Sequence, residues 1–191
     1  MHFCSTYEKG VPMKDRKSVL NLTVSGLCLA IAYLLPFLTG QVPKIGAMLL
    51  PMHLPVLLCG FVCGWQWGLA VGFVAPLFRS LTLGKPVFFP AAVCMAFELA
   101  TYGIIAGLMH GILPKKKPYI YLSLLISMIV GRIVWGAAMV ACTVVGGGSF
   151  TFTAFVTGAF ATSIPGIIIQ FILIPILVMF IESKKALKSN D

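Results

Sequence analysis

Charge is scarce in this sequence, and acidic charge is scarcer still. Of the 191 residues only 10% are charged and five are Asp or Glu, whereas 59% are hydrophobic. The mean hydropathy is +1.01. The surface of a soluble domain carries many charges, so this composition excludes a soluble domain and indicates a chain surrounded by lipid. The apolar runs are long and unbroken rather than alternating, which favours membrane helices over a β-barrel.

Motifs for ATP use and for hydrolytic catalysis are also absent. The sequence has no Gly-x4-Gly-Lys-Ser/Thr loop, so the chain cannot power transport with ATP by itself. It has no His-Glu-x-x-His, no Gly-x-Ser-x-Gly and no pair of intramembrane aspartates, so no motif supports an enzyme. Cys59 and Cys63 share a helix face, but no His or carboxylate joins them at metal-site spacing. No inverted repeat is detectable, which argues against a self-sufficient secondary transporter.

Six apolar segments are predicted to be transmembrane helices. They cover residues 18–38, 48–63, 69–83, 87–113, 119–145 and 152–181. The expected fold class is an all-α membrane protein, a six-helix bundle with both termini in the cytoplasm. Its expected parts are an N-terminal tail (1–17), the membrane domain (18–183) and a C-terminal tail (184–191).

Two features qualify the second and third spans. Pro51 and Pro55 predict that the outer end of the second span is kinked or partly unwound. The five residues Gly64–Gly68 are interpreted as a tight turn that places two tryptophans at the interface. A single re-entrant unit over 48–83 is the alternative, and it would break the count of six.

The basic residues fall mainly in three clusters, at 9–17, 115–117 and 184–188. With six spans, all three clusters lie on the same side as both termini, which the positive-inside rule assigns to the cytoplasm. Nucleic-acid binding is the other interpretation of basic clusters. The apolar composition of the chain argues against nucleic-acid binding, and we expect the lipid bilayer to surround the protein.

Four ionisable side chains lie inside the predicted spans: His53, Arg79, Glu98 and Arg132. Such residues are costly in lipid and usually face a cavity or each other. A helical rise of about 1.5 Å per residue places all four in the middle or outer half of the membrane. They belong to four different helices, so we expect them to converge on a pocket that opens outward.

Each of these residues also has a structural interpretation. Glu98 can pair with Arg132 or Arg79 in a purely structural ion pair that neutralises a buried charge. His53 can be a satisfied polar group between two prolines. For Arg79 we favour a ligand contact, because a guanidinium suits a carboxylate or a phosphate.

Aromatic and polar neighbours extend the candidate site. Tyr102 follows Glu98, and Trp135 follows Arg132, at helical spacing, while Gln170 adds a hydrogen-bonding group in the last span. Any one of these is more often a packing residue, and it is the cluster that favours a pocket. The expected substrate-binding residues are His53, Arg79, Glu98, Tyr102, Arg132 and Trp135.

Small residues recur every fourth position in two places. One series is Gly60, Gly64, Gly68 and Gly72. This spacing lets helices approach closely, and we interpret the series as packing within the bundle. The motif Gly26-x-x-x-Ala30 in the first span can pack in the same way or dock a partner.

Three features together resemble a known family. They are the six-span layout with a basic N-terminal tail, the Gly26-x-x-x-Ala30 motif, and the segment Leu50–Gly60 followed by Gly64–Gly72. With these features the chain resembles the substrate-binding S component of energy-coupling factor (ECF) transporters, the bacterial vitamin importers. The resemblance extends over about Lys14 to Lys185.

The resemblance implies a mechanism and partners. An S component binds a vitamin from outside in a pocket roofed by loops that correspond here to 39–47, 84–88 and 146–151. It then associates with a separate transmembrane coupling subunit and two ATPase subunits, which reorient it to release the vitamin inside. ATP is used by those partners, and no cofactor is expected in this chain. Gly26 and Ala30 are expected to meet the coupling subunit in the bacterial cytoplasmic membrane.

The ligand and the exact function stay open at this point. Two arginines favour an anionic vitamin such as pantothenate, whereas Glu98 with His53 and aromatic residues suits a pyridoxine-like compound equally well. An autonomous proton-coupled carrier or channel with Glu98 as the proton site is an alternative function. An intramembrane enzyme that uses His53 and Glu98 is a third.

Overall fold

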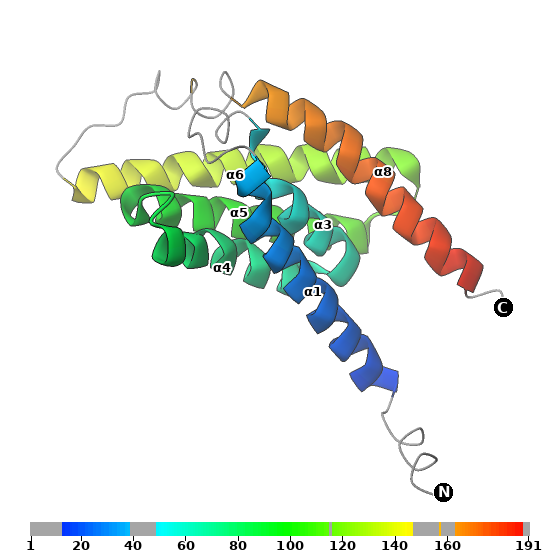
Figure 1. Cartoon of the computed structure of the whole chain (residues 1–191). Helices are drawn as coiled ribbons and strands as arrows, with labels where there is room; N and C mark the ends of the chain where they lie inside the picture. Colours follow the sequence, from blue (N-terminus) through cyan, green and yellow to red (C-terminus); the bar gives the residue numbers. More distant parts are fainter. Residues whose placement is uncertain (1–12, 39–48, 115, 147–156, 158–162, 189–191) are drawn as a thin grey trace, which may run out of the picture.

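The computed structural model describes residues 13–38, 49–114, 116–146, 157 and 163–188 (Figure 1). Within these residues the protein is helical and contains no strand, which confirms the all-α fold. The helices are α1 (Met13–Leu38), α3 (His53–Cys63), α4 (Trp65–Leu83), the π-helical turn η1 (Phe88–Ala92), α5 (Val93–Ile112), α6 (Lys117–Val145) and α8 (Ile164–Lys188). The predicted loops at 39–47 and 146–151 lie outside the described residues, apart from Gly146.

In the part of the chain that the structure describes, four helical stretches are long and apolar enough to cross a membrane. They cover 17–37, 88–112, 117–145 and 164–184, and they correspond to the first, fourth, fifth and sixth predicted spans. The second and third predicted spans correspond to α3, with 11 residues, and α4, with 19. The count of six crossings and the cytoplasmic location of both termini stay predictions.

α3 is short because the helix is interrupted at Leu50–Met52, within the predicted second span. Pro51 and Met52 form a turn, and Leu50 before them has a φ of 49°. The ring of a proline disfavours helical geometry in the preceding residue, and the helix begins only at His53. Pro55 lies in the first turn of α3, where its missing N–H costs no hydrogen bond. The length of α3 is about 16 Å, roughly half the apolar thickness of a bilayer.

The connection between α3 and α4 is one glycine rather than the predicted five-residue turn. Gly64 has a φ of 95°, which an L side chain rarely adopts. Its carbonyl accepts a hydrogen bond of 3.0 Å from the amide of Gly68. α4 therefore begins at Trp65, and Trp67 lies in its first turn. The prediction of a longer turn was wrong because Gly64 alone reverses the chain.

α5 is the centre of the bundle and packs against α3, α4 and α6 (Figure 1). Its contact with α4 brings the two backbones together. A Cβ at Gly72 would fall on the carbonyl of Leu99, and a Cβ at Gly103 would fall on the backbone of Gly68. A Cβ at Gly60 of α3 would lie 2.7 Å from the carbonyl oxygen of Gly103. Gly60, Gly68 and Gly72 of the four-residue series are thus confirmed as packing residues within the bundle.

α1 and α8 flank this centre. α1 packs against α3 and α4, and α8 packs against α3 and α6. The start of α1 and the end of α8 point to the same end of the bundle (Figure 1). Both helices extend into the segments that were predicted as tails, because α1 begins at Met13 and α8 ends at Lys188.

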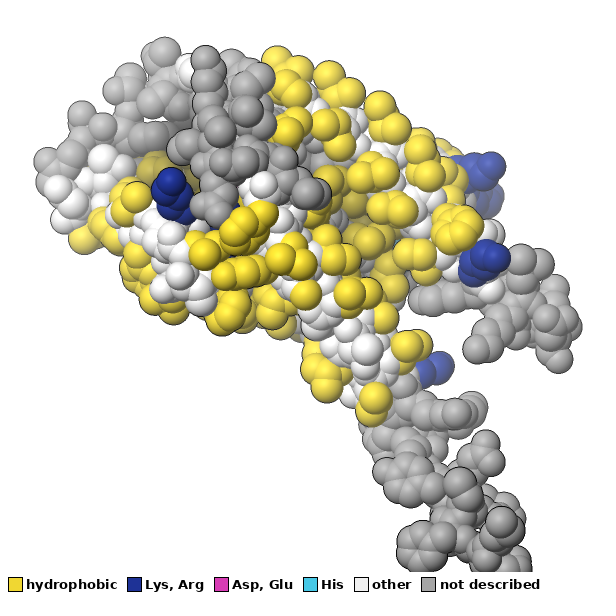
Figure 2. All heavy atoms as spheres, viewed as in Figure 1, with side chains coloured by type: hydrophobic (Ala, Val, Ile, Leu, Met, Phe, Trp, Pro, Cys, Tyr) yellow, Lys and Arg dark blue, Asp and Glu magenta, His cyan; other side chains and the backbone are white. Residues whose placement is uncertain are grey.

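The distribution of polarity is the inverse of that in a soluble protein. Large apolar side chains are exposed along α1, α4, α6 and α8, and they cover most of the described surface in Figure 2. The buried polar or charged residues are Ser25, His53, Arg79, Ser80, Glu98, Ser123, Ser127, Arg132, Ser163 and Gln170. Hydrocarbon as the surrounding solvent explains both observations, because polar groups then find partners only inside the protein.

Candidate functional site

A buried carboxylate, Glu98 of α5, gathers side chains from three helices. Its Oε1 lies 2.9 Å from Nη1 of Arg132 on α6 and accepts a 3.1 Å hydrogen bond from the hydroxyl of Tyr102. Nε2 of His53, at the start of α3, lies 3.5 Å from the same oxygen, within ion-pair range. None of the four side chains is more than 5% exposed. We call these four residues the Glu98 cluster, and all four belong to the predicted site.

Local spacing and one glycine hold the Glu98 cluster together. Glu98 and Tyr102 are four residues apart on α5 and therefore share a face. The ring of Tyr102 also packs against the imidazole of His53, with 5.2 Å between the centroids. A Cβ at Gly131 of α6 would lie 2.5 Å from Cε1 of Tyr102. Gly131 therefore leaves room for the tyrosine. It was not among the predicted site residues, although a glycine next to an intramembrane arginine was an available signal.

The helical rise predicts, from two separate helices, that the Glu98 cluster lies near the middle of the membrane. His53 is ten residues from the end of α3 at Cys63, which corresponds to about 15 Å. Glu98 is ten residues beyond Phe88, where the helical segment begins, which also gives about 15 Å. The apolar thickness of a bilayer is about 30 Å. At this depth a charged group is most costly, and charged groups retained there are usually functional.

Several polar atoms in this part of the protein are buried without a hydrogen-bond partner among the described residues. They are Nε and Nη2 of Arg132, both ring nitrogens of His53, and both amide atoms of Gln170. A buried polar group without a hydrogen bond costs about 1–3 kcal/mol, so such groups usually bind water or a ligand. The charges of Glu98 and Arg132 already cancel. The arrangement therefore offers hydrogen-bonding capacity without an excess of charge.

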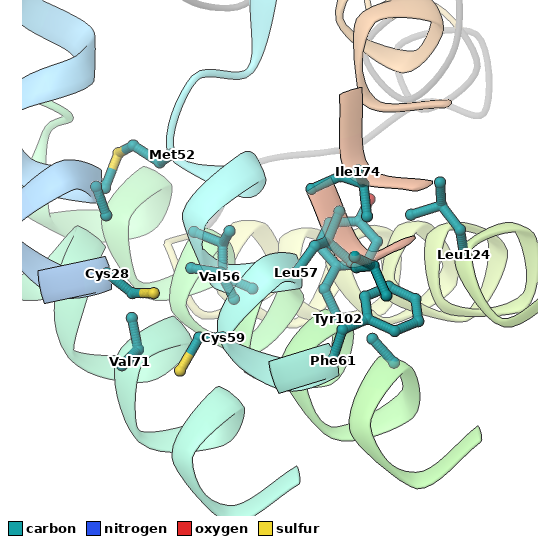
Figure 3. Packing of buried hydrophobic residues seen from close by; sticks show 14 of the residues in the cluster. Cys28, Met52, Val56, Leu57, Cys59, Phe61, Val71, Tyr102, Leu124 and Ile174 are labelled. Atoms are coloured by element: carbon teal, nitrogen blue, oxygen red, sulfur yellow. The ribbon is translucent and has the colours of Figure 1, made fainter. Parts of the chain in front are cut away.

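Gln170 lies on the buried face of α8. Ile174, one turn further along, is also fully buried, and it belongs to the same apolar cluster as Leu57 of α3. Leu57 and Ile174 lie side by side in Figure 3, and α3 packs against α8. Leu57 in turn follows His53 by one helical turn. The face of α8 that carries Gln170 is therefore the face that packs against α3.

Replacement of Gln170 by methionine is expected to separate a binding role from a packing role. Methionine has a similar length and no amide, so Gln170→Met should leave the ligand-free free energy of unfolding within about 1 kcal/mol or raise it. It should weaken the binding of a ligand that contacts the amide about tenfold. The measurement is thermal unfolding followed by tryptophan fluorescence, and Gln66→Met at an exposed position is the matched control. A ligand-free loss well above 1 kcal/mol would show that the amide has a structural partner.

Arg79 is buried in a different place, between α1, α4 and the loop after α4. Its Nη1 donates to the carbonyl of Tyr33 at 2.9 Å, and its Nε donates to the carbonyl of Lys85 at 3.2 Å. The guanidinium also lies 5.4 Å from the centroid of the Phe37 ring. The predicted convergence of four ionisable residues is therefore not observed for Arg79, whose contacts join α1 to the C-terminal end of α4. A ligand contact at Arg79 stays a prediction.

The small-residue motif of the first helix lies on open surface. Cys28 and Ala32 are on the buried face of α1, whereas Gly26 and Ala30 are exposed on another face. A Cβ at Gly26 would meet nothing within 4 Å. Among the described residues this motif therefore makes no close contact within the bundle, unlike the glycines of α3 and α4.

Trp135, the remaining predicted site residue, is half-buried on α6, three residues after Arg132.

A second pair of ionisable side chains was not predicted from the sequence. Nε2 of His110 lies 3.1 Å from Oε1 of Glu182. This pair joins the last turn of α5 to α8, at the end of the bundle where the three basic clusters were predicted. The available signal was a histidine and a carboxylate near the ends of two predicted spans.

A family model described as "ECF transporter, substrate-specific component" matches residues 20–178. The match includes every residue of the Glu98 cluster and the exposed motif of α1. The chain belongs to the ECF transporter substrate-specific component family. No curated protein and no solved structure matches it. The resemblance found in the sequence is thus confirmed, and this S component is a multi-pass membrane protein that binds a substrate for transport.

Family membership assigns the chain to substrate binding rather than catalysis. His53 and Glu98 are close together, as an intramembrane enzyme would require. However, the same Glu98 oxygen is already engaged by Arg132 and by Tyr102. The contacts that Glu98 makes with three other side chains explain the proximity of His53 and Glu98.

Proposed function

We propose that this S component captures a small water-soluble vitamin from outside and holds it at the Glu98 cluster. The observation that carries the site is a set of buried donors and acceptors on Arg132, His53 and Gln170 that have no hydrogen-bond partner in the described part of the chain. At mid-membrane depth these groups have no bulk water to bind, so a polar ligand stabilises them. The family, whose members bind small-molecule substrates, supports the same function.

In this proposal Glu98 acts as a positioning residue. One of its two carboxylate oxygens, Oε1, contacts Arg132, Tyr102 and His53, which lie on three helices. A preorganised site of this kind loses less conformational entropy when the ligand binds. Pantothenate and pyridoxine-like compounds are the vitamins that we favour, because both present polar groups on a small framework.

Release of the vitamin requires partners in this proposal. The chain has no nucleotide-binding loop, and ECF S components work with an energising ECF module. We infer that this module contains a transmembrane coupling subunit and two ATPase subunits in the bacterial cytoplasmic membrane. The exposed Gly26 and Ala30 face of α1 is the proposed docking surface for the coupling subunit, because small residues let two helices approach closely.

The experiment that tests the function is a thermal-shift titration of the purified protein against a panel of B vitamins. We expect one vitamin to stabilise the fold, and a concentration of 100 Kd should add about 2.7 kcal/mol. Liposomes that contain the protein alone should not accumulate that vitamin. Accumulation against a gradient without partners would instead establish an autonomous carrier.

The docking surface leads to a separate prediction for Ala30→Leu. The larger side chain should block close approach of the coupling subunit and reduce vitamin uptake by cells at least tenfold. It should leave the affinity of the isolated protein for its vitamin within about twofold, because Ala30 is exposed. Uptake assays and vitamin titrations of the same variant test both parts, with Leu27→Ala at an exposed neighbouring position as the control. Loss of binding by the isolated Ala30→Leu variant would contradict the proposal.

A further inference from the structure

The guanidinium of Arg132 is only partly used inside the protein. Nη1 contacts Glu98 at 2.9 Å, whereas Nε and Nη2 are buried without a partner among the described residues. Nε and Nη2 lie on the same edge of the planar guanidinium and direct two parallel N–H bonds away from it. This edge is the fork that binds the two oxygens of a carboxylate, or two oxygens of a phosphate.

The other arginine in the membrane does not offer this edge. Nε of Arg79 donates to the carbonyl of Lys85, and Nη1 donates to the carbonyl of Tyr33. The fork of Arg79 is therefore already partly occupied by the backbone. Of the two arginines inside the predicted spans, Arg132 is the one whose Nε and Nη2 are both available.

The charges around Arg132 favour a ligand group with one negative charge. Glu98 and Arg132 cancel each other, Tyr102 is neutral while its hydroxyl donates to Glu98, and His53 carries at most one positive charge. A carboxylate adds one negative charge, which a protonated His53 balances. A doubly charged phosphate would leave at least one negative charge uncompensated near the middle of the membrane, which is costly.

The surroundings of the cluster indicate what the rest of the ligand is like. Tyr102 belongs to an apolar cluster with Leu57, Leu124 and Ile174 (Figure 3). Gln170 lies one helical turn before Ile174 on α8, and its amide donor and acceptor have no hydrogen-bond partner among the described residues. Aliphatic surface together with one free amide suits a compact ligand that carries an amide or a hydroxyl group.

We infer that the ligand is a small monocarboxylate with an amide or hydroxyl group, and that the Nε and Nη2 edge of Arg132 binds its carboxylate. This inference rests on the proposed function and makes its ligand class specific. Arg132 is then a specificity-determining residue, and Glu98 orients it by holding Nη1. Pantothenate is one member of this class, and pyridoxine, which has no carboxylate, is not.

The test uses matched pairs of compounds with the purified full-length protein. The pairs are pantothenate with panthenol, nicotinate with nicotinamide, and pyridoxal 5′-phosphate with pyridoxal. Affinities come from tryptophan quenching, for the wild type and for Arg132→Lys. Lysine keeps the positive charge next to Glu98 and lacks the two-pronged edge, so thermal unfolding of the ligand-free variant checks that the fold is retained.

We expect a carboxylate to bind at least 100-fold more tightly than its neutral partner in the wild type. We expect Arg132→Lys to weaken that binding about 10- to 100-fold, as the loss of a charge-assisted hydrogen bond would. Binding of the phosphate compound, or equal binding of a carboxylate and its neutral partner, would overturn the inference and leave the proposed function intact. Binding of no B vitamin at all would overturn both. The wild-type comparison decides the matter even if Arg132→Lys does not fold.

Discussion

Glu98→Leu is expected to lower the free energy of unfolding by about 3–5 kcal/mol. In the native protein Nη1 of Arg132 lies 2.9 Å from Oε1 of Glu98. The substitution removes this carboxylate and leaves the guanidinium buried without it. It also removes the acceptor of the Tyr102 hydroxyl and the ion-pair partner of His53. An unpaired charge near the middle of the membrane has no water to relieve it, so the loss should lie at the upper end of the range.

The measurement is unfolding in lipid nanodiscs followed by tryptophan fluorescence. Glu182→Gln is the control, because Glu182 also pairs with a histidine, His110, but is 29% exposed at the end of the bundle. We expect the control to change the free energy of unfolding by less than about 1 kcal/mol. Equal losses in the two variants would contradict the central position of Glu98.

A double variant separates the structural role of the pair from its binding role. Glu98→Leu with Arg132→Met removes both charges together, and paired removal of a buried ion pair is often neutral or stabilising. We expect the double variant to recover most of the stability lost by Glu98→Leu and to bind no vitamin. A stable double variant that still binds with wild-type affinity would contradict the binding role. The pair of Glu98 and Arg132 would then serve only to neutralise a buried charge.

Gly72→Val is expected to destabilise the bundle by about 3 kcal/mol or more, because the new side chain has no space. A Cβ at this position would fall on the carbonyl of Leu99, which is backbone of the central helix α5 and cannot turn aside as a side chain can. The contact between α4 and α5 would have to open along its length. The expected readouts are a lower thermal midpoint and a larger aggregated fraction in size-exclusion chromatography.

Gly26→Val is the matched control for this prediction. It introduces the same side chain into another membrane helix, at a glycine where a Cβ meets nothing within 4 Å. We expect its stability to stay within about 1 kcal/mol of the wild type, since valine costs a helix no more than glycine does. A thermal midpoint for Gly72→Val equal to that of Gly26→Val would show that α4 and α5 are not in backbone contact.

Arg79 shows how the end from which depth is counted affected the predicted site. Counted from the turn predicted at 64–68, Arg79 lies 11 residues, or about 16 Å, along its helix. Counted from the other end, it is only four residues, or about 6 Å, from Leu83, where both the predicted span and α4 end. Glu98 lies about 15 Å from the start of its own helical segment. The two side chains therefore lie at different depths, which separates them.

The sequence by itself determined the solvent, the helical class and the family, because hydrophobic run length and the scarcity of charge are local properties of the chain. It also determined that Glu98 and Tyr102 share a face, since four residues make about one helical turn. Only the tertiary structure decided that Arg132 rather than Arg79 pairs with Glu98. That choice depends on how α5 packs between its neighbours, and close contacts at Gly72, Gly103 and Gly131 set this packing. Contacts between helices far apart in the sequence leave no periodic signal, so the free edge of Arg132 became visible only once the helices were assembled.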